Sequence, residues 1–257
     1  MKNFSGRGKL ISALSVICAI GLWEYFGKEV DPIFASYPSA IVEAFVDLVR
    51  NGVLLKAFLQ SMKALAAGYC LAAVVGVTLG LILGRYRLAE SGLGIYIYGL
   101  DSTPLIALIP LFILWLGLGF SVKVLIIFLL AVTPIVMNTW AGVKSVPRTL
   151  IELGDAFVAS DTAIMRKIIL PATLPYIMTG LRLAVGRSII SMVVAEFFTS
   201  ISGLGGLILK SGESLNTAQM FVPVILLTVL GLCLTNLVSW LEHKVAPWQK
   251  ETTGARP

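Results

Sequence analysis

Four ionisable side chains lie inside or at the ends of long apolar stretches, and they are the residues best placed to do chemistry: Glu24, Asp101, Arg182 and Glu196. A charge at the centre of a bilayer costs about 2.5 to 3.5 kcal/mol on insertion scales, so such groups usually face protein or a water-filled cavity. Asp101 is followed by Ser102, Thr103 and the helix-breaking Pro104. This combination predicts a polar point on a solute path through the membrane.

Simpler structural roles compete with a path at each position. Asp101 could form a structural ion pair or cap the backbone at a kink, and Arg182 could anchor in the cytoplasmic interface. Glu24 and Glu196 fall near the outer ends of their stretches, where hydration would satisfy them. Arg182 or Arg187 could face an anionic solute, although interface anchoring explains both better. The path candidates are therefore Asp101, Thr103, Pro104, Arg182 and Glu196.

Motifs for catalysis are missing from the sequence. Residues 6–10 (GRGKL) contain a Gly-Lys pair but lack the first glycine and the Ser or Thr of a phosphate-binding Walker A loop. There is no Gly-x-Ser-x-Gly elbow and no HExxH, the three cysteines have no CxxC spacing, and His243 is the single histidine. We expect a chain that is not an enzyme, does not hydrolyse ATP itself, and binds no metal or cofactor.

The composition identifies an integral membrane protein. Of the 257 residues, 57% are hydrophobic and 13% are charged, and the mean hydropathy is +0.91. The net charge of +6 does not indicate nucleic-acid binding, because the basic residues lie between apolar stretches rather than along one helix face.

The elements that must position the charged residues are membrane-spanning helices. A helix needs about 20 apolar residues to cross a bilayer, and this rule predicts an all-α protein with six spans. They are Leu10–Gly27, Ala64–Gly84, Gly92–Phe120, Val124–Val143, Tyr176–Phe198 and Met220–Trp240. The third is long, and we expect Pro104 and Pro110 to kink it.

The distribution of Lys and Arg predicts the orientation. Twelve of them fall in the terminal segments and in the connections after the second and fourth spans, against six on the opposite side. Positive residues favour the cytoplasm, so we expect both termini and the connection after the fourth span to be cytoplasmic.

One predicted span carries a small residue at every fourth position: Ala64, Gly68, Ala72, Gly76, Gly80 and Gly84. Stripes of this kind let helix backbones approach closely in lipid. The stripe could serve packing within one subunit or a seam between two copies, and we favour packing within the subunit.

A polar segment from Val146 to Pro175 interrupts the apolar pattern, and it looks like a docking element. Pro147 suits the first position of a short helix whose apolar side chains Leu150, Leu153 and Phe157 share one face. Ser160 or Asp161 could cap a second short helix, which we expect to stop at Pro171.

Gly203, Leu204 and Gly205 follow the fifth predicted span at its outer end. Glycines permit a tight re-entrant turn, which could shape an outer gate or be an ordinary loop.

The polar segment resembles the cytoplasmic loop of binding-protein-dependent ABC importer permeases. The pattern of that loop is Glu-Ala-Ala, three residues, Gly, nine residues, Ile-x-Leu-Pro. Glu152, Ile168, Leu170 and Pro171 match it, whereas Leu153 and Gly154 stand at the alanines and Val158 stands at the glycine. The absent glycine puts the turn between the two short helices in question. The residues expected to couple to the ATPase are Glu152, Leu153, Gly154, Phe157, Val158, Ala159, Ile168, Leu170 and Pro171.

The similarity extends from about residue 37 to 241, through the runs PLIALIPLFILWLGLG, PIVMNTWAG and LPYIMTGLRL. These runs look like the branch of permeases for alkanesulfonates, taurine, nitrate and bicarbonate, with relatives that carry pyrimidine or flavin precursors. The resemblance implies a type I ABC importer permease fold, a single transmembrane domain over residues 1–257 and a coupling loop at 146–175. It also implies a bacterial inner-membrane homodimer, two ATP-binding subunits and an extracytoplasmic solute-binding protein.

Two other classes of function compete with this one. An ion-coupled secondary carrier would use membrane carboxylates such as Asp101 and run without ATP. A lipid-modifying membrane enzyme would need a nucleophile and a base, and the sequence offers no such set. Neither class explains the docking element, so we favour the permease.

Overall fold

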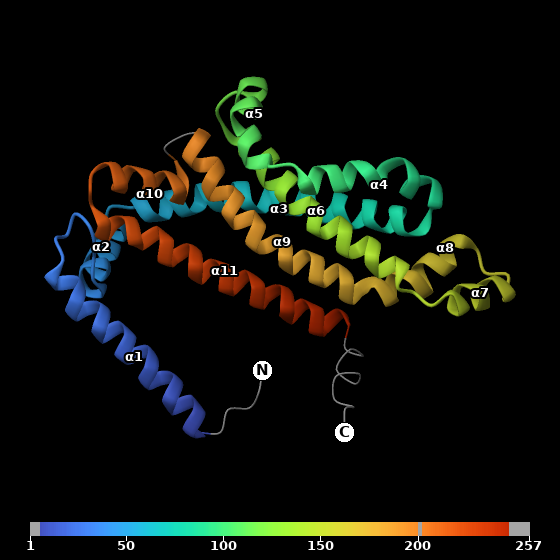
Figure 1. The fold of residues 1–257 in the computed structure, drawn as a ribbon, viewed down its shortest axis with the longest axis horizontal. Helices are drawn as coiled ribbons and strands as arrows, with labels where there is room; N and C mark the ends of the chain where they lie inside the picture. Colours follow the sequence, from blue (N-terminus) through green and yellow to red (C-terminus); the bar gives the residue numbers. More distant parts are fainter. Residues whose placement is uncertain (1–5, 200–201, 247–257) are drawn as a thin grey trace. The chain divides into compact units, whose positions relative to one another are not determined.

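The computed structural model describes residues 6–199 and 202–246, and the regular secondary structure of this part of the chain is all helical, without strands (Figure 1). The helices are α1 (Gly6–Glu29), α2 (Pro38–Arg50), α3 (Val53–Arg85), α4 (Arg87–Ser102), α5 (Ile109–Leu116), α6 (Phe120–Lys144), α7 (Arg148–Ala156), α8 (Asp161–Ile164), α9 (Leu170–Thr199), α10 (Gly203–Glu213) and α11 (Thr217–Val245). A 3₁₀ turn, Leu105–Leu108, precedes α5, and a π-helical turn, Met165–Ile169, joins α8 to α9.

The described residues form two compact units. One contains residues 6–60 with 202–228, and the other contains 61–199 with 229–246. Asp101, Arg182, Glu196 and the segment 146–175 all belong to the second unit.

In the first unit, Glu24 organises the start of α2. Its carboxylate accepts hydrogen bonds from the Ser39 backbone N–H at 3.0 Å and from the Ser39 hydroxyl at 2.8 Å, and Lys28 Nζ lies 2.7 Å away. The bond from the Ser39 N–H satisfies one orphan backbone donor of the first helical turn, which is the role of a capping carboxylate. Glu24 therefore has protein partners, and its side chain also stays 27% exposed.

In the second unit, α3 and α6 pack through the stripe of small residues. A Cβ atom added at Gly68, Gly76, Gly80 or Gly84 would lie 2.4 to 2.8 Å from a Cβ atom of α6. The facing residues are Ile127, Ile135, Thr139 and Val143, each the same number of residues further along the chain. The two helices therefore run parallel, with glycines receiving β-branched side chains. The prediction of packing within the subunit is confirmed.

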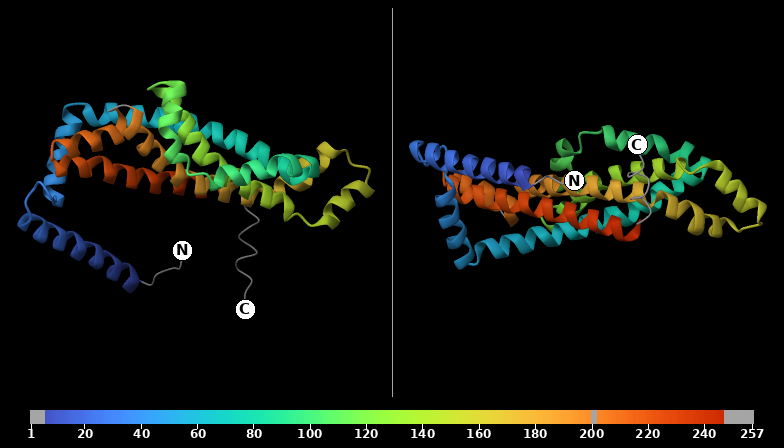
Figure 2. Two further views of the ribbon diagram at one scale, coloured as in Figure 1. Left: turned by 45° about the horizontal axis from the view of Figure 1, so that its top comes forward. Right: turned by 90° about the horizontal axis from the view of Figure 1, so that it is seen from below.

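On its other side α6 packs against α9, and the two helices lie side by side in both views of Figure 2. A Cβ atom at Gly142 would meet Tyr176 Cβ at 2.6 Å, and one at Gly180 would meet the backbone of Pro134 and Ile135 at 3.1 Å. The order of these contacts makes the pair antiparallel. Helix α6 is thus held from two sides by close backbone approach.

The third predicted span is broken rather than kinked. Helices α4 and α5 meet at a bend of 84°, with the break at Thr103 and Pro104. Pro110 lies in the first turn of α5, where a missing N–H costs nothing, so our expectation of a kink at Pro110 was wrong. In the described part of the chain, five helices are long and apolar enough to cross a membrane, and the bent pair makes six. The six-span prediction is confirmed.

We expect Gly80→Ala to lower the free energy of unfolding by about 1 to 3 kcal/mol, because the new methyl group would lie 2.8 Å from the Val136 carbonyl oxygen, a backbone atom that cannot rotate away. The thermal unfolding midpoint of the purified protein in detergent measures this. Gly92→Ala in α4 is the matched control, since no atom lies within 4 Å of its added Cβ. Equal midpoints for the two variants would contradict the packing argument.

Candidate functional site

The segment 146–175 forms two helices joined by a tight turn, as its sequence predicts. Ser160 is the N-cap of α8, and its hydroxyl accepts a hydrogen bond from the Ala163 N–H at 3.3 Å. Pro147 is the N-cap of α7 rather than its first helical residue, so that prediction was one residue out. The reason is its ψ of 129°, which keeps the proline in extended backbone just before the helix.

The turn after α7 is built on Val158, which has a φ of 54°. The Val158 N–H donates to the Asp155 carbonyl at 2.9 Å, and the Ala159 N–H donates to the Gly154 carbonyl at 3.0 Å. This pair of bonds is a Schellman motif, in which the left-handed position usually holds glycine. The turn is therefore kept despite the missing glycine, and a β-branched residue occupies a strained conformation.

Helix α8 does not stop at Pro171, and that prediction was wrong. The chain continues through the π-helical turn at residues 165–169 into α9, so residues 161–199 form one continuous helical rod. A regular α-helix would press the Pro171 ring against the Lys167 carbonyl. The wider π turn contains Lys167 and ends two residues before the proline, and it accommodates that conflict.

The inner face of the loop is fixed by packing. Gly154 lies against α8 and the π turn, where an added Cβ would meet Ile164 at 3.0 Å and Ile168 at 3.2 Å. Ile164 and Ile169 form a small core with Val143 at the end of α6. The predicted coupling residues Gly154, Ala159 and Ile168 thus hold α7 on the rod.

The outer face of the loop is apolar and open. Leu153, Phe157 and Val158 are 53%, 79% and 91% exposed, and Leu150 and Glu152 are also exposed. These five residues form what we call the docking face. Phe157 and Val158 stand on the turn itself, so the conformation of the turn sets the position of the most exposed apolar groups.

Charged groups attach the loop to neighbouring helices. Asp161, the alternative cap, accepts hydrogen bonds from Arg85 Nε at 3.1 Å and from the Tyr86 hydroxyl at 2.9 Å. The bond to Asp161 raises the pKa of Tyr86, because it stabilises the protonated hydroxyl. Lys144 lies 2.6 Å from Glu90 of α4.

A second feature is a cavity of about 400 Å³ at the break between α4 and α5. Asp101, Thr103 and Pro104 line it together with Thr133 of α6 and Arg187 of α9. Arg187 Nη1 donates to Asp101 Oδ1 at 3.0 Å and to the Thr133 hydroxyl at 3.1 Å. Three of the five path candidates therefore share one cavity, and Asp101 also has the ion pair that our alternative expected.

The other two path candidates lie elsewhere in this unit. Arg182 pairs with Glu242 of α11. Glu196 is fully buried, accepts a hydrogen bond from the Ser61 hydroxyl at 2.7 Å, and interacts with the buried Lys123. Hydration of Glu196 was therefore the wrong interpretation. Sequence reasoning did not identify Ser61, Thr133 or Glu242 as partners, because each contact joins helices far apart in the chain.

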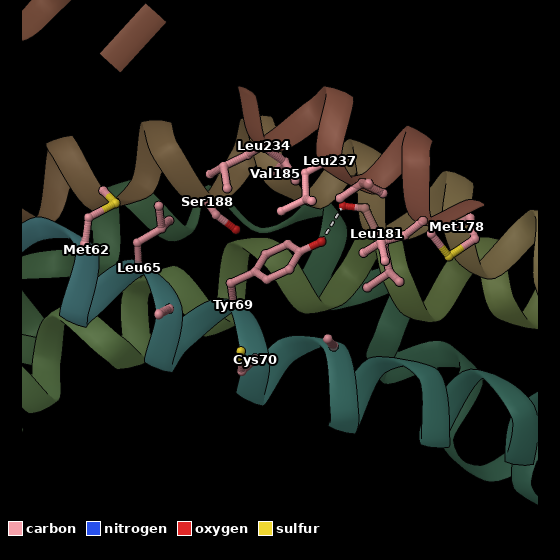
Figure 3. A pocket seen from close by; sticks show the side chains of 14 residues that line it. Met62, Leu65, Tyr69, Cys70, Met178, Leu181, Val185, Ser188, Leu234 and Leu237 are labelled. Atoms are coloured by element: carbon pink, nitrogen blue, oxygen red, sulfur yellow. Dashed lines mark hydrogen bonds between the residues drawn. The ribbon is translucent and has the colours of Figure 1, made fainter. Parts of the chain in front are cut away.

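An apolar groove of about 420 Å³ lies between α3, α9 and the second half of α11 (Figure 3). The Tyr69 hydroxyl at this groove donates to the Leu181 carbonyl at 2.9 Å, and the Ser188 hydroxyl donates to the Ala184 carbonyl at 2.7 Å. Both hydroxyl groups already donate to backbone, and the rest of the lining consists of Leu, Val, Met, Ala and Cys. The groove suits hydrocarbon, whereas the cavity at Asp101 suits a polar solute.

The predicted outer-gate residues belong to the first unit. Gly203, Leu204 and Gly205 are buried and begin α10, with Gly203 at a φ of 81°. The Gly203 N–H donates to Gln60 Oε1 at 3.1 Å. Gly203 therefore provides the turn that its residue type predicts, and the role of these residues as a gate stays a prediction.

Comparison with known proteins gives a family match and close relatives. The family described as "Binding-protein-dependent transport system inner membrane component" matches residues 76–247. The putative aliphatic sulfonates transport permease SsuC of Escherichia coli is 36% identical over 82% of this chain and 80% of its own. The nitrate import permease NrtB of Leptolyngbya laminosa is 28% identical over 94% and 89%.

The fold is also found in solved structures. A chain of the inward-facing MetNI methionine ABC transporter superposes with a TM-score of 0.64 at 19% identity, over 75% of this chain and 95% of that one. The predicted type I importer fold is confirmed.

We expect Val158→Gly to stabilise the turn by up to about 1 kcal/mol. The left-handed backbone conformation costs a branched residue roughly 1 to 2 kcal/mol, and glycine avoids this cost. Part of the gain is lost, because glycine gives up more conformational entropy on folding. Hydrogen exchange at the amides of residues 158 and 159 should slow up to about fivefold. The control Ala156→Gly, at the end of α7, should accelerate exchange, since glycine is a poor helix former. Faster exchange in Val158→Gly would show that the strain argument is wrong.

Proposed function

Because the chain belongs to the family of binding-protein-dependent transport system inner membrane components, and is thus an ABC importer permease, we propose that it carries a small oxyanion across the membrane. The candidate substrates are an alkanesulfonate, taurine, nitrate or bicarbonate. The support is the cavity at Asp101, where an arginine and a threonine hydroxyl meet at a helix break, together with relatives named for sulfonates and for nitrate.

ATP-binding subunits dock on the loop 146–175 in this proposal. The observation that supports it most is the docking face, where large apolar groups are exposed on a helix whose other face is packed. Exposed apolar patches of this kind mark protein interfaces. The docking face lies outside the predicted bilayer core, so a protein partner rather than lipid would cover it.

The continuous rod from Asp161 to Thr199 would transmit movement of the ATP-binding subunits into the membrane. Arg187 lies on this rod, so a displacement at α8 would shift Arg187 relative to Asp101 on α4. Coupling of two sites needs an element whose position both sites bias. The rod meets that requirement because it carries the loop at one end and lines the cavity further along.

The assembly we propose contains two copies of this chain, two ATP-binding subunits and an extracytoplasmic solute-binding protein. It lies in a bacterial inner membrane with both termini in the cytoplasm, as the distribution of Lys and Arg predicts. Residues 1–257 form a single transmembrane domain in this proposal, and the chain itself holds no cofactor.

The docking proposal is tested by Phe157→Ser, which we expect to weaken binding of the ATP-binding subunits at least about tenfold, since loss of an aromatic anchor typically costs 2 kcal/mol or more. Glu152→Lys should weaken it as well. Co-purification and ATP-driven uptake in vesicles measure both. Phe34→Ser is the matched control, because Phe34 is 81% exposed but lies between α1 and α2. Full binding and uptake in both loop variants would refute docking here.

The orientation is tested by single cysteines at the same two phenylalanines, in a chain whose native cysteines are replaced. We expect a membrane-impermeant maleimide to label Phe34→Cys in intact cells and to label Phe157→Cys only after the membrane is opened. The opposite pattern would place the loop outside and exclude docking to a cytoplasmic ATPase.

A further inference from the structure

We propose that Asp101 and Arg187 together form a binding site for a small zwitterion, a solute with an anionic oxyacid group and an ammonium group on a short chain. This inference rests on the proposed transport function and specifies its substrate class. In the site, the anionic group of the solute takes the place of Asp101 on Arg187, and the ammonium group takes the place of Arg187 on Asp101.

The first argument is the charge of the cavity. Among the residues that line it, Arg187 and Asp101 are the charged ones, and they already satisfy each other at 3.0 Å. A simple anion that bound Arg187 would leave the Asp101 carboxylate without a cation. An unpaired charge inside a membrane-spanning segment is unfavourable. A zwitterion replaces both partners at once, so neither charge is left alone.

The second argument is the position of Asp101 at the end of a helix. Asp101 is the residue before the last of α4, whose C-terminal carbonyl groups carry a partial negative charge. The Thr103 hydroxyl is occupied by the Gly99 carbonyl at 2.7 Å. This corner of the cavity therefore favours a cation and disfavours an anion.

The third argument is the place of Arg187 opposite that corner. Arg187 comes from α9, and the nearly buried Thr133 of α6 lies 3.1 Å from the same nitrogen. Its guanidinium group can hold an oxyacid through two parallel hydrogen bonds, as arginine does with carboxylates and sulfate-like groups. The remaining lining consists of Leu, Ile and Pro side chains, which suit a short hydrocarbon chain between the two charged ends.

Opening the pair also links binding to movement. Asp101 lies on α4 and Arg187 on α9, so a solute that enters between them must separate two side chains that come from different helices. Breaking this pair also discriminates a zwitterion from a solute with one charge. Only a solute that pairs with both Asp101 and Arg187 makes the break favourable.

The experiment is a thiol-protection assay on the detergent-purified complex of this chain with its ATP-binding subunits, with the native cysteines replaced. Ile106→Cys places a reporter in the cavity, and Leu237→Cys places a control in the apolar groove; both positions are about half exposed. N-ethylmaleimide modification is timed with taurine and β-alanine, and with the single-charge analogues ethanesulfonate, propionate and ethylammonium. Isothermal titration of the same compounds gives a second measurement.

We expect saturating taurine or β-alanine to slow modification of the reporter at least about tenfold, and the single-charge analogues and the control position to show no change. Asp101→Asn should weaken taurine binding at least about tenfold, the cost of one charge-assisted hydrogen bond, and should let ethanesulfonate protect. The double variant Asp101→Asn with Arg187→Gln leaves no lone charge, so it should fold and show no protection.

Protection by ethanesulfonate equal to that by taurine in the unaltered chain would overturn the proposal in favour of a simple anion site. Absence of protection and of binding heat would overturn it altogether. The role as an importer subunit is tested separately, because co-purification of the ATP-binding subunits and ATP-driven uptake in the Phe157→Ser variant do not depend on the cavity.

Discussion

Close approach of helix backbones around α6 is the constraint on which the rest of the second unit depends. Glycines of α3 receive Ile127, Ile135, Thr139 and Val143 from one side, and Gly142 and Gly180 bring α9 onto the other. The hydrophobic effect does not favour association of helices in lipid, because the lipid tails are as apolar as the side chains. Close packing of the backbones must therefore stabilise the helix pairs. This arrangement also positions the Asp101 cavity and the loop, since Arg187 lies on α9 and Val143, in the last turn of α6, packs against Ile164 and Ile169.

The docking loop keeps a turn that favours glycine, although a valine occupies the left-handed position. The Schellman turn needs a left-handed residue, and Val158 occupies that position at the cost of strain. The same residue is almost fully exposed beside Phe157. A glycine at position 158 would lower the backbone strain but remove part of the exposed apolar surface. A change that stabilises the turn would therefore weaken the interaction with a partner.

Much of this fold was predictable from the sequence, because the length and hydropathy of an apolar stretch indicate a membrane-spanning helix. The six spans, the glycine stripe and the Ser160 cap follow from local patterns and were found. The break at Pro104, the passage of the helix through Pro171 and the partners of Glu196 and Arg187 were not fully anticipated. Each depends on contacts with a helix that is far away in the chain, and the local pattern of a single sequence does not show which helices meet.

The π-helical turn at residues 165–169 has a consequence for the phase of the long rod. A π turn holds about one residue more than an α turn, and one residue corresponds to about 100° of rotation about the axis. A chain that lost one residue here would form an ordinary α turn and keep the two ends of the rod in nearly the same relative direction, whereas the same loss elsewhere in the rod would turn one end by about 100°. This short stretch therefore absorbs one residue of the chain, so the docking face and the Asp101 cavity keep their relative orientation about the rod despite the extra length.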